Sequence, residues 1–448
     1  MKYLSLLATL LLLGSCATKQ EELEQSKSID VKRDKSIDLA QPEQIEDLKI
    51  VPQDIRVYVK NLEKVKKISQ EEYEKSYFKV WNYKKPQVSL SKAMWAHKAY
   101  TVGNTYGENL QLLKQSFYDA TLENANFEKF ATLNRQAITL KLVNLRAMPT
   151  SDPILLDPSK AGEGFPFDYL QNSTVAANKP LFLSHYSKDK EWAFVESSFA
   201  YGWVKTRNIA IIDKKYTDKW QKAEQMFVVK EGVPVYSENN HFLFKTRIGM
   251  MFALVDEDRE SYQVLAISKY KDMQPLYVKA RIKKDVLNKE NISFTGKNIV
   301  HILNEVASKN YGWGGIYGQR DCSSTLRDFY APFGLWLPRN SYQQSRAGEV
   351  ISLDSLTEEQ KIQTIKEKAI PFRTLLYKRG HIVLYVGTYN GQVIVFQNVW
   401  GVKTVHNGVE GRFVIGRPVF STLEIGKNLR DYDSDGSLLK NLKSMTTL

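Results

Sequence analysis

Residues 311–324 read YGWGGIYGQRDCSS, a glycine-rich and aromatic turn that runs into Asp321 and Cys322. The residues that follow have a helical pattern, which Pro332 and Gly334 end. Cys322 is therefore predicted at the start of a helix. Unpaired N–H groups and the positive end of the helix dipole favour a thiolate there, so we expect a thiol pKa lowered from about 8.5 toward 7 or below. An inert core cysteine would have apolar neighbours, but those of this cysteine are Arg320, Asp321, Ser323 and Ser324.

A histidine and two amides follow on a predicted hairpin. Of the six histidines, only His381 starts an apolar strand, HIVLYVG. An Asn-Gly turn then predicts a returning strand, which carries Gln397 and Asn398. Strand alternation lets only one of these amides face the imidazole, and the pattern leaves both open. His381 alone would fit a structural role, but a cysteine on a helix with a histidine and an amide on paired strands favours nucleophilic catalysis.

The N-terminus, MKYLSLLATLLLLGSC, combines Lys2 with an apolar run and small residues before Cys16. This pattern is typical of a secretory signal and not of a membrane-spanning helix. Its last four residues resemble a bacterial lipobox, so we expect 1–16 to be a lipoprotein signal peptide and Cys16 to be lipidated. The alternative is cleavage near Ala17 with loss of Cys16. With Cys16 in the anchor, Cys322 is the remaining thiol and no internal disulfide can form.

The rest of the chain is predicted to form several domains. The chain of 448 residues is too long to fold around one compact core, and 43% of its residues are hydrophobic. Charged residues without aromatics predict a disordered tether up to residue 55. Apolar spacing then predicts helices, and short strands separated by turns predict two SH3-like barrels before a C-terminal α+β domain. The expected boundaries are 17–55 for the tether, 56–145 for the helical domain, 146–214 and 215–285 for the barrels, and 286–448 for the last domain.

The net charge of +13 is spread along the chain. It suits a surface of anionic lipid or cell-wall polymer, or simply a solvated surface, and nucleic acid is not expected as a partner. The other histidines lack paired ligand spacing, so no metal is expected. The GWGG segment lacks the lysine of a phosphate loop, so neither a nucleotide nor another cofactor is expected.

Several of these segments carry a family resemblance. YGWGGIYGQRDCSS, LPRNSYQQ, GHIVLYVG and FQNVWG are similar to sequences of the NlpC family of papain-like cell-wall peptidases. The closest resemblance is to its multidomain branch, which has an N-terminal stabilising region and two bacterial SH3-like domains before the papain-like domain. The resemblance implies a cysteine peptidase that cleaves peptidoglycan stem peptides between γ-D-glutamate and the diamino acid, and we expect it to be a monomer. It would act in the cell envelope on a lipid anchor. Ala17 after Cys16 favours the outer membrane, facing the periplasm, in a Gram-negative cell.

The resemblance also implies roles for individual residues. Cys322 would be the nucleophile and His381 the general base. The third position falls on Gln397, where family members often have histidine, and this favours Gln397 over Asn398. Tyr311 would place its hydroxyl near the scissile carbonyl or serve only in packing. The D-glutamyl contacts would be Asp321, Ser323, Asn340 and Ser341, of which Asp321 and Ser323 could also cap the helix.

In the multidomain branch, the first SH3-like domain selects a free N-terminal L-alanine. Glu196 and Tyr201 are the expected contacts for its amine, although each taken singly is better explained as a surface charge or a core aromatic residue of the barrel. Two other functions stay open at this point. One is a catalytically inactive wall-peptide-binding lipoprotein that uses its SH3-like domains. The other is an acyl- or amide-transferring relative on the same fold.

Overall fold

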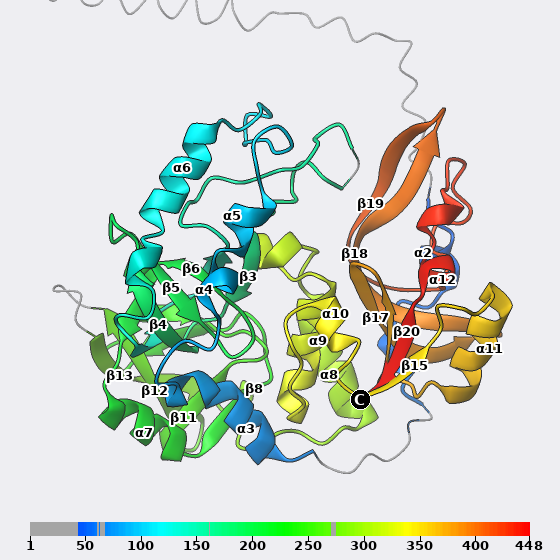
Figure 1. Cartoon of the computed structure of the whole chain (residues 1–448). Helices are drawn as coiled ribbons and strands as arrows, with labels where there is room; N and C mark the ends of the chain where they lie inside the picture. Colours follow the sequence, from blue (N-terminus) through cyan, green and yellow to red (C-terminus); the bar gives the residue numbers. More distant parts are fainter. Residues whose placement is uncertain (1–43, 61, 63–67, 161, 270–274) are drawn as a thin grey trace, which may run out of the picture. The chain divides into compact units, whose positions relative to one another are not determined.

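The computed structural model describes residues 44–60, 62, 68–160, 162–269 and 275–448, which form helices and three antiparallel sheets (Figure 1). The predicted signal peptide, Cys16 and residues 17–43 of the predicted tether lie outside the described residues. Within the described ranges, none of the helices has both the length and the apolar composition needed to cross a membrane. This α+β multidomain architecture agrees with the predicted fold class.

The prediction of a disordered tether is wrong for its last residues. Ile45, Val51 and Ile55 are all buried, and they pack against the C-terminal domain. The Asp47 carboxylate accepts hydrogen bonds from the backbone N–H (2.8 Å) and the hydroxyl (2.7 Å) of Thr422. Apolar residues spaced among charges are enough to dock this segment. Its short helices are α2 (Asp47–Ile50) and η2 (Ile55–Val57).

Helices between residues 70 and 129 pack against both barrels. Trp81 donates its indole N–H to the Ala137 carbonyl of the first barrel (2.9 Å), and the Tyr77 hydroxyl accepts from the Met251 N–H of the second (3.3 Å). The elements are α3 (Gln70–Phe78), η3 (Lys79–Asn82), α4 (Leu90–Ala93), α5 (Trp95–Ala99), α6 (Gln115–Asn124) and η4 (Phe127–Lys129).

The first barrel is a seven-stranded sheet of order β3-β2-β6-β5-β4-β1-β7. It begins at Arg135, ahead of the predicted boundary at 146, because Phe127 and Phe130 pack on the barrel and do not continue a helix. Its strands are β1 (Arg135–Thr139), β2 (Val143–Arg146), β3 (Gln171–Val175), β4 (Pro180–Tyr186), β5 (Trp192–Glu196), β6 (Tyr201–Lys205) and, after η5 (Thr206–Asn208), β7 (Ile209–Ile211).

The second barrel follows α7 (Lys214–Lys222) and has the order β10-β9-β13-β12-β11-β8-β14. Its strands are β8 (Gln225–Val228), β9 (Pro234–Ser237), β10 (Phe242–Lys245), β11 (Met251–Glu257), β12 (Ser261–Lys269), β13 (Pro275–Lys283) and β14 (Leu287–Asn288).

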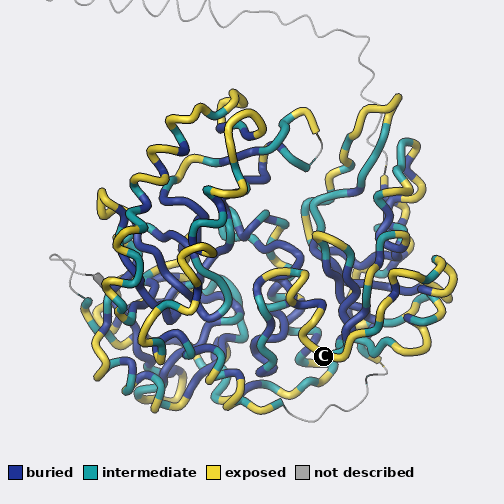
Figure 2. Tube along the Cα trace, viewed as in Figure 1, coloured by how far each residue is buried: buried dark blue, intermediate teal, exposed yellow. Residues whose placement is uncertain are grey.

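The C-terminal domain packs two helices on a six-stranded sheet of order β15-β20-β16-β17-β18-β19 (Figure 1). Strand β16 and the first halves of β17 and β18 are mostly buried, whereas β15 and the far end of the β18–β19 ribbon are intermediate or exposed (Figure 2). The helices are α8 (Gly296–Ala307), α9 (Cys322–Tyr330), α10 (Ser341–Gln344), α11 (Glu358–Lys368) and α12 (Leu438–Asn441), and the short turns are η6 (Trp313–Gly318), η7 (Ala331–Phe333) and η8 (Ser434–Gly436). The strands are β15 (Glu349–Ser352), β16 (Thr374–Lys378), β17 (His381–Tyr389), β18 (Gln392–His406), β19 (Val409–Ser421) and β20 (Ser444–Thr447).

The structure contains the predicted hairpin between β17 and β18. Tyr389 pairs with Gln392 in an antiparallel register, so the turn has two residues. Asn390 and Gly391 both have positive φ, at 49° and 77°. Such a turn favours these two residue types, which explains why the sequence signal was reliable.

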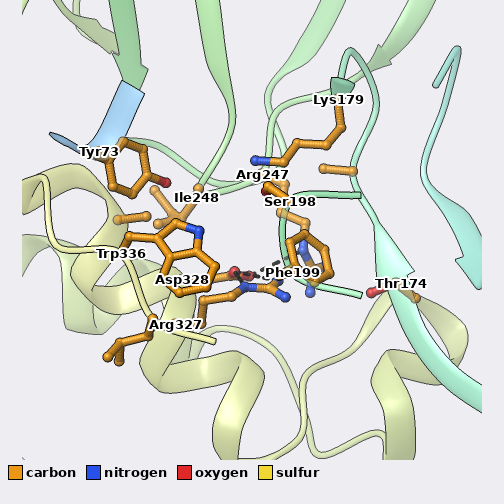
Figure 3. A pocket seen from close by; sticks show the side chains of 14 residues that line it. Tyr73, Thr174, Lys179, Ser198, Phe199, Arg247, Ile248, Arg327, Asp328 and Trp336 are labelled. Atoms are coloured by element: carbon orange, nitrogen blue, oxygen red, sulfur yellow. Dashed lines mark hydrogen bonds and ion pairs between the residues drawn. The ribbon is translucent and has the colours of Figure 1, made fainter. Parts of the chain in front are cut away.

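Buried charges join the second barrel to the C-terminal domain. Arg320, which is fully buried, donates to Asp328 (2.8 Å) and to Glu231 of the second barrel (2.9 Å). Lys179, Arg247 and Arg327 lie near Asp328 around a cavity of about 30 Å³ (Figure 3). Removing one partner of such a buried network is costly, so these contacts fix the two domains against each other.

Candidate active site

The glycine-rich turn before Cys322 is held by both barrels. An added Cβ on Gly314 would lie 2.1 Å from the Gln171 carbonyl oxygen, and one on Gly315 would lie 2.5 Å from the Thr174 hydroxyl. Both glycines also have positive φ, so strand β3 can approach this closely only because they are glycines. From the second barrel, Arg247 donates to the carbonyls of Gly318 (2.7 Å) and Gln319 (3.0 Å).

Cys322 is the first residue of α9, as the sequence predicts. Asp321 caps the helix by accepting from the Ser324 N–H (2.8 Å), and Ser324 reciprocates by accepting from the Asp321 N–H (2.9 Å). The Cys322 sulfur accepts hydrogen bonds from the N–H groups of Ile382 and Ser323. The first of these donors follows His381 directly, so the helix and strand β17 bring the thiol next to the histidine.

The expected low pKa of the thiol is wrong. Burial, and after it the negative charge of the Asp321 carboxylate, raise the pKa of Cys322 to about 12. The two N–H donors favour the thiolate but do not outweigh these effects. The sequence locates the helix N-terminus correctly but cannot show that the sulfur is buried beside an anion. At neutral pH the group is therefore a thiol, and a base must take its proton before it can attack.

His381 is bonded to Gln397 and not to Asn398. The Nε2 atom of His381 and the Oε1 atom of Gln397 are 2.9 Å apart. Burial lowers the pKa of His381 to about 4, although the hydrogen bond with Gln397 acts to raise it. Asn398 points to the other side of β18, where it donates to the Arg320 carbonyl (2.8 Å) and the Thr325 hydroxyl (2.9 Å).

The hydrogen-bond chain behind Gln397 determines which nitrogen of His381 is the base. The Thr422 carbonyl can only accept, so Ser421 donates to it (2.8 Å). The Ser421 oxygen then accepts from the Gln397 amide NH₂ (2.6 Å), which leaves the amide oxygen facing His381. Nε2 must carry the hydrogen of that bond. Nδ1 of the neutral ring is therefore unprotonated and can accept a proton.

A buried ion pair lies beside the thiol. Arg339 donates to Asp321 (2.6 Å), to the Ser323 hydroxyl (3.0 Å) and to the Ser173 hydroxyl of the first barrel (2.7 Å). Although burial opposes ionisation, Arg339 keeps the pKa of Asp321 below its usual value. Sequence reasoning missed Arg339. The LPRN segment contained the signal, because an arginine between apolar residues and a predicted cap needs a buried acceptor.

The other residues predicted to contact the substrate near its scissile bond lie in different parts of the site. Tyr311 is half-buried, and desolvation raises the pKa of its hydroxyl well above the usual value, with smaller contributions from Cys322 and Asp321. Its place beside the scissile carbonyl stays a prediction. Asn340 is exposed and caps α10 by accepting from the Gln343 N–H (2.9 Å), and Ser341 is the first residue of that helix.

Glu196 and Tyr201 face the N-terminal helices. Glu196 accepts from the N–H groups of Gln87 (2.8 Å) and Val88 (3.2 Å), and burial raises its pKa. The Tyr201 hydroxyl donates to the Lys92 carbonyl at 3.4 Å. These contacts argue against an amine site built from the two side chains. A glutamate at a strand end looks the same in sequence whether it meets substrate or a neighbouring domain.

A cavity of about 210 Å³ lies at the candidate site. Tyr311, His381 and Gln397 line it, together with Trp400. Its charged lining is entirely basic, from Lys378, Lys403 and Arg412. Among the described residues, no group of three or more His, Cys, Asp or Glu side chains is placed to hold a metal ion.

Four family models match the chain. They are the N-terminal stabilising domain of NlpC/P60 proteins (residues 5–130), an SH3 domain of SH3b1 type (153–205), an SH3 domain of SH3b2 type (213–259) and the NlpC/P60 family itself (308–409). A search of curated proteins found no match.

Two solved structures extend the comparison. An NlpC/P60 endopeptidase from Photobacterium damselae subsp. piscicida is 25% identical, with a TM-score of 0.76 over 89% of this chain and 97% of that one. An NlpC/P60 family protein from Bacillus cereus is 16% identical, with a TM-score of 0.43 over 69% of this chain and 98% of that one. The chain belongs to the NlpC/P60 family of peptidases, with a stabilising N-terminal domain and two SH3 domains ahead of the peptidase domain.

Proposed function

We propose that this protein is a cysteine peptidase that cleaves peptidoglycan stem peptides between γ-D-glutamate and the diamino acid. One observation supports this most strongly: the Cys322 sulfur accepts the N–H of Ile382, the residue after a histidine that Gln397 orients. Thiol catalysis requires a nucleophile beside a base, with a third group that orients the base.

The first step makes a thioester. Nδ1 of His381 takes the thiol proton as the sulfur of Cys322 attacks the γ-carbonyl carbon. The carbonyl oxygen gains negative charge, which the N–H of Cys322 and the Tyr311 hydroxyl would stabilise. When the C–N bond breaks, the protonated His381 gives its proton to the departing amine. The acyl half stays on sulfur.

The second step releases the acyl half. His381, neutral again, takes a proton from water as the water oxygen attacks the thioester carbon. The C–S bond breaks and the proton returns to the sulfur, so the thiol is restored and the free γ-carboxylic acid leaves and ionises in solvent. In each half of the cycle His381 first accepts a proton as a base and then donates it as an acid. It is therefore neutral again at the end of each half.

The D-glutamyl part would lie against Asp321, Ser323 and Arg339. Its free α-carboxylate is an acceptor for the buried guanidinium, which already spans Asp321 and the Ser323 hydroxyl. Asn340 and Ser341, at the start of the next helix, would complete this side. The enzyme would also select a free N-terminal L-alanine, which would bind on this same side of the site, next to the D-glutamyl part.

We also propose that the enzyme is a lipoprotein of the cell envelope, anchored through Cys16. The lipobox-like end of the predicted signal supports this. The apolar residues at 45–55 pack on the peptidase domain, so residues 17–43 would form the link between anchor and enzyme.

Cys322→Ala and Cys322→Ser should abolish cleavage of L-Ala-γ-D-Glu-meso-diaminopimelate while leaving the fold intact, because each removes only the sulfur nucleophile. Product release is measured by mass spectrometry, and folding by thermal unfolding. The matched control is Ser308→Ala, at the exposed end of α8, which should cleave as the wild type does. Full activity of Cys322→Ala would contradict the proposal. An inactive wild type that still binds the tripeptide would favour the binding lipoprotein instead.

Gln397→Ala should lower kcat by about 10- to 100-fold, because the lost hydrogen bond to a histidine that becomes charged is worth about 1.5–3 kcal/mol. Gln397→Glu tests positioning directly. A carboxylate facing Nε2 should raise the pKa of His381 and move the acid limb of the kcat profile to higher pH. A purely structural role for Gln397 would leave that limb where it is.

The pH profile should show an acid limb near the pKa of His381, about 4, and not near the usual value of about 6.5. Catalysis needs neutral His381, so kcat/KM should hold down to about pH 5 and fall below it. Between about pH 6.5 and 4 the unfolded chain binds the His381 proton more readily than the folded one, so stability also decreases as the pH is lowered through this range. Circular dichroism at each pH separates the two effects. An acid limb at 6.5 with intact folding would contradict the assignment.

A further inference from the structure

A small cavity of about 30 Å³ lies where the N-terminal helices, both barrels and the peptidase domain meet (Figure 3). The charged and hydroxyl-bearing residues that line it are Tyr73 of α3, Thr174, Lys179 and Ser198 of the first barrel, Arg247 of the second barrel, and Arg327 and Asp328 of α9. Three of these are basic and one is acidic. When all four are ionised, the lining therefore carries two more positive than negative charges.

The single carboxylate on the lining is already shared among arginines. Oδ1 of Asp328 accepts from Arg327 (2.9 Å) and Oδ2 accepts from Arg320 (2.8 Å), with Nε of Arg247 at 3.5 Å. Arg320 does not line the cavity, and it also pairs with Glu231 (2.9 Å). One carboxylate thus neutralises part of the charge of three guanidinium groups, and it leaves no acceptor for a further cation.

Lys179 is the cation without an acceptor. The residue is only 6% exposed, and no described residue accepts a hydrogen bond from its ammonium. The ammonium lies over the Tyr77 ring, 3.1 Å from its centre, and in Figure 3 it points from the first barrel toward the middle of the cavity. Burial, and after it repulsion from Arg327, lower the pKa of Lys179 well below its usual value. Buried charges in proteins are paired, so this one lacks its partner.

Two further donors on the lining also lack a partner. The Ser198 hydroxyl and Nη1 of Arg327 are buried, and neither forms a hydrogen bond within the part of the chain that the structure describes. Buried donors in native proteins are almost always satisfied. Together with the Lys179 ammonium, these two groups indicate a missing acceptor.

The nearby carboxylates do not supply that acceptor. Glu305 accepts from the Glu231 N–H (2.7 Å) and does not line the cavity. Glu196 accepts from two backbone N–H groups of the N-terminal region, and Asp321 pairs with Arg339 (2.6 Å). Each of these groups already has donors of its own, so the missing acceptor comes from outside the chain.

We propose that this cavity binds one small monovalent anion, of the size and charge of chloride, held by Lys179, Arg327 and Ser198. An anion accepts from all three donors and lowers the excess of positive charge. A water molecule would satisfy some of the donors but would leave the charge uncompensated. One water needs roughly 10–15 Å³, so the cavity has room for a particle of about this size and excludes an anion as large as gluconate.

The bound anion joins separate parts of the fold. Lys179 and Ser198 belong to the first barrel, whereas Arg327 lies on the helix that begins at Cys322. Because these groups come together only in the folded chain, the anion binds that state alone and stabilises it as its concentration rises. The anion site is separate from the proposed active site, so the proposal holds whether or not the chain cleaves peptidoglycan.

Bromide, which replaces chloride and scatters anomalously, locates the site directly. Crystals of the full chain are grown in sodium bromide or in sodium gluconate, and diffraction is measured at the bromine absorption edge. The bromide crystals should show an anomalous peak in the cavity, in contact with the Lys179 ammonium, and the gluconate crystals should show none. Bromide peaks on the surface alone, with water in the cavity, would mean an adventitious ion only and would overturn the proposal.

Thermal unfolding tests the anion in solution. At constant ionic strength, replacing gluconate by chloride should raise the Tm of the wild type by at least about 2 °C. Lys179→Met should lose most of this rise, and in gluconate it should melt no lower than the wild type, because it removes an uncompensated buried cation. Ser198→Ala should weaken the response to chloride. The matched control is Lys366→Met, an exposed lysine on α11, which should respond as the wild type does.

The remaining outcomes are decisive in the same way. Equal melting of the wild type in both salts would overturn the proposal. So would a Lys179→Met variant that melts lower in both salts and keeps the full response to chloride, because Lys179 would then serve only in packing. An anomalous peak in the cavity without any rise in Tm would contradict stabilisation by the anion.

Discussion

The site depends on the buried contact between Arg339 and Asp321. Asp321 has two tasks, because it caps the helix that begins at Cys322 and it pairs with the guanidinium. Arg339 in turn reaches Ser173 of the first barrel. A buried pair broken on one side costs about 3–5 kcal/mol, so the thiol, its helix and the neighbouring domain keep one arrangement. The same carboxylate raises the pKa of the thiol, so the proposed thiol catalysis would depend on His381 as its base.

The two barrels serve as a scaffold for the catalytic turn. Strand β3 packs on Gly314, and Arg247 of the second barrel holds the backbone three residues before Cys322. A papain-like domain alone would leave this turn exposed on two sides. The barrels therefore support the proposed active site without supplying one of its proposed catalytic residues.

Local patterns in the sequence predicted the parts of the site that depend on local structure. The helix start at Cys322, the Asn-Gly turn and the strand at His381 each follow from a few neighbouring residues, and the family resemblance added the preference for Gln397 that the structure places against His381. The failures involve distant partners. Burial of the Cys322 sulfur, the role of Arg339 and the contact of Glu196 with Gln87 all depend on how separate domains meet. The docking of residues 45–55 was missed for the same reason, because three apolar residues among charges reveal no partner.

The central claim is that Cys322 carries the acyl half during turnover, and trapping this intermediate tests it most directly. An activated γ-ester of L-alanyl-D-glutamate acylates quickly, so hydrolysis of the acyl-enzyme should limit its turnover. Acid quenching followed by intact-mass analysis and peptide mapping should find one L-alanyl-γ-D-glutamyl group on Cys322. Turnover of the ester with Cys322 unmodified at every quench time would contradict the account.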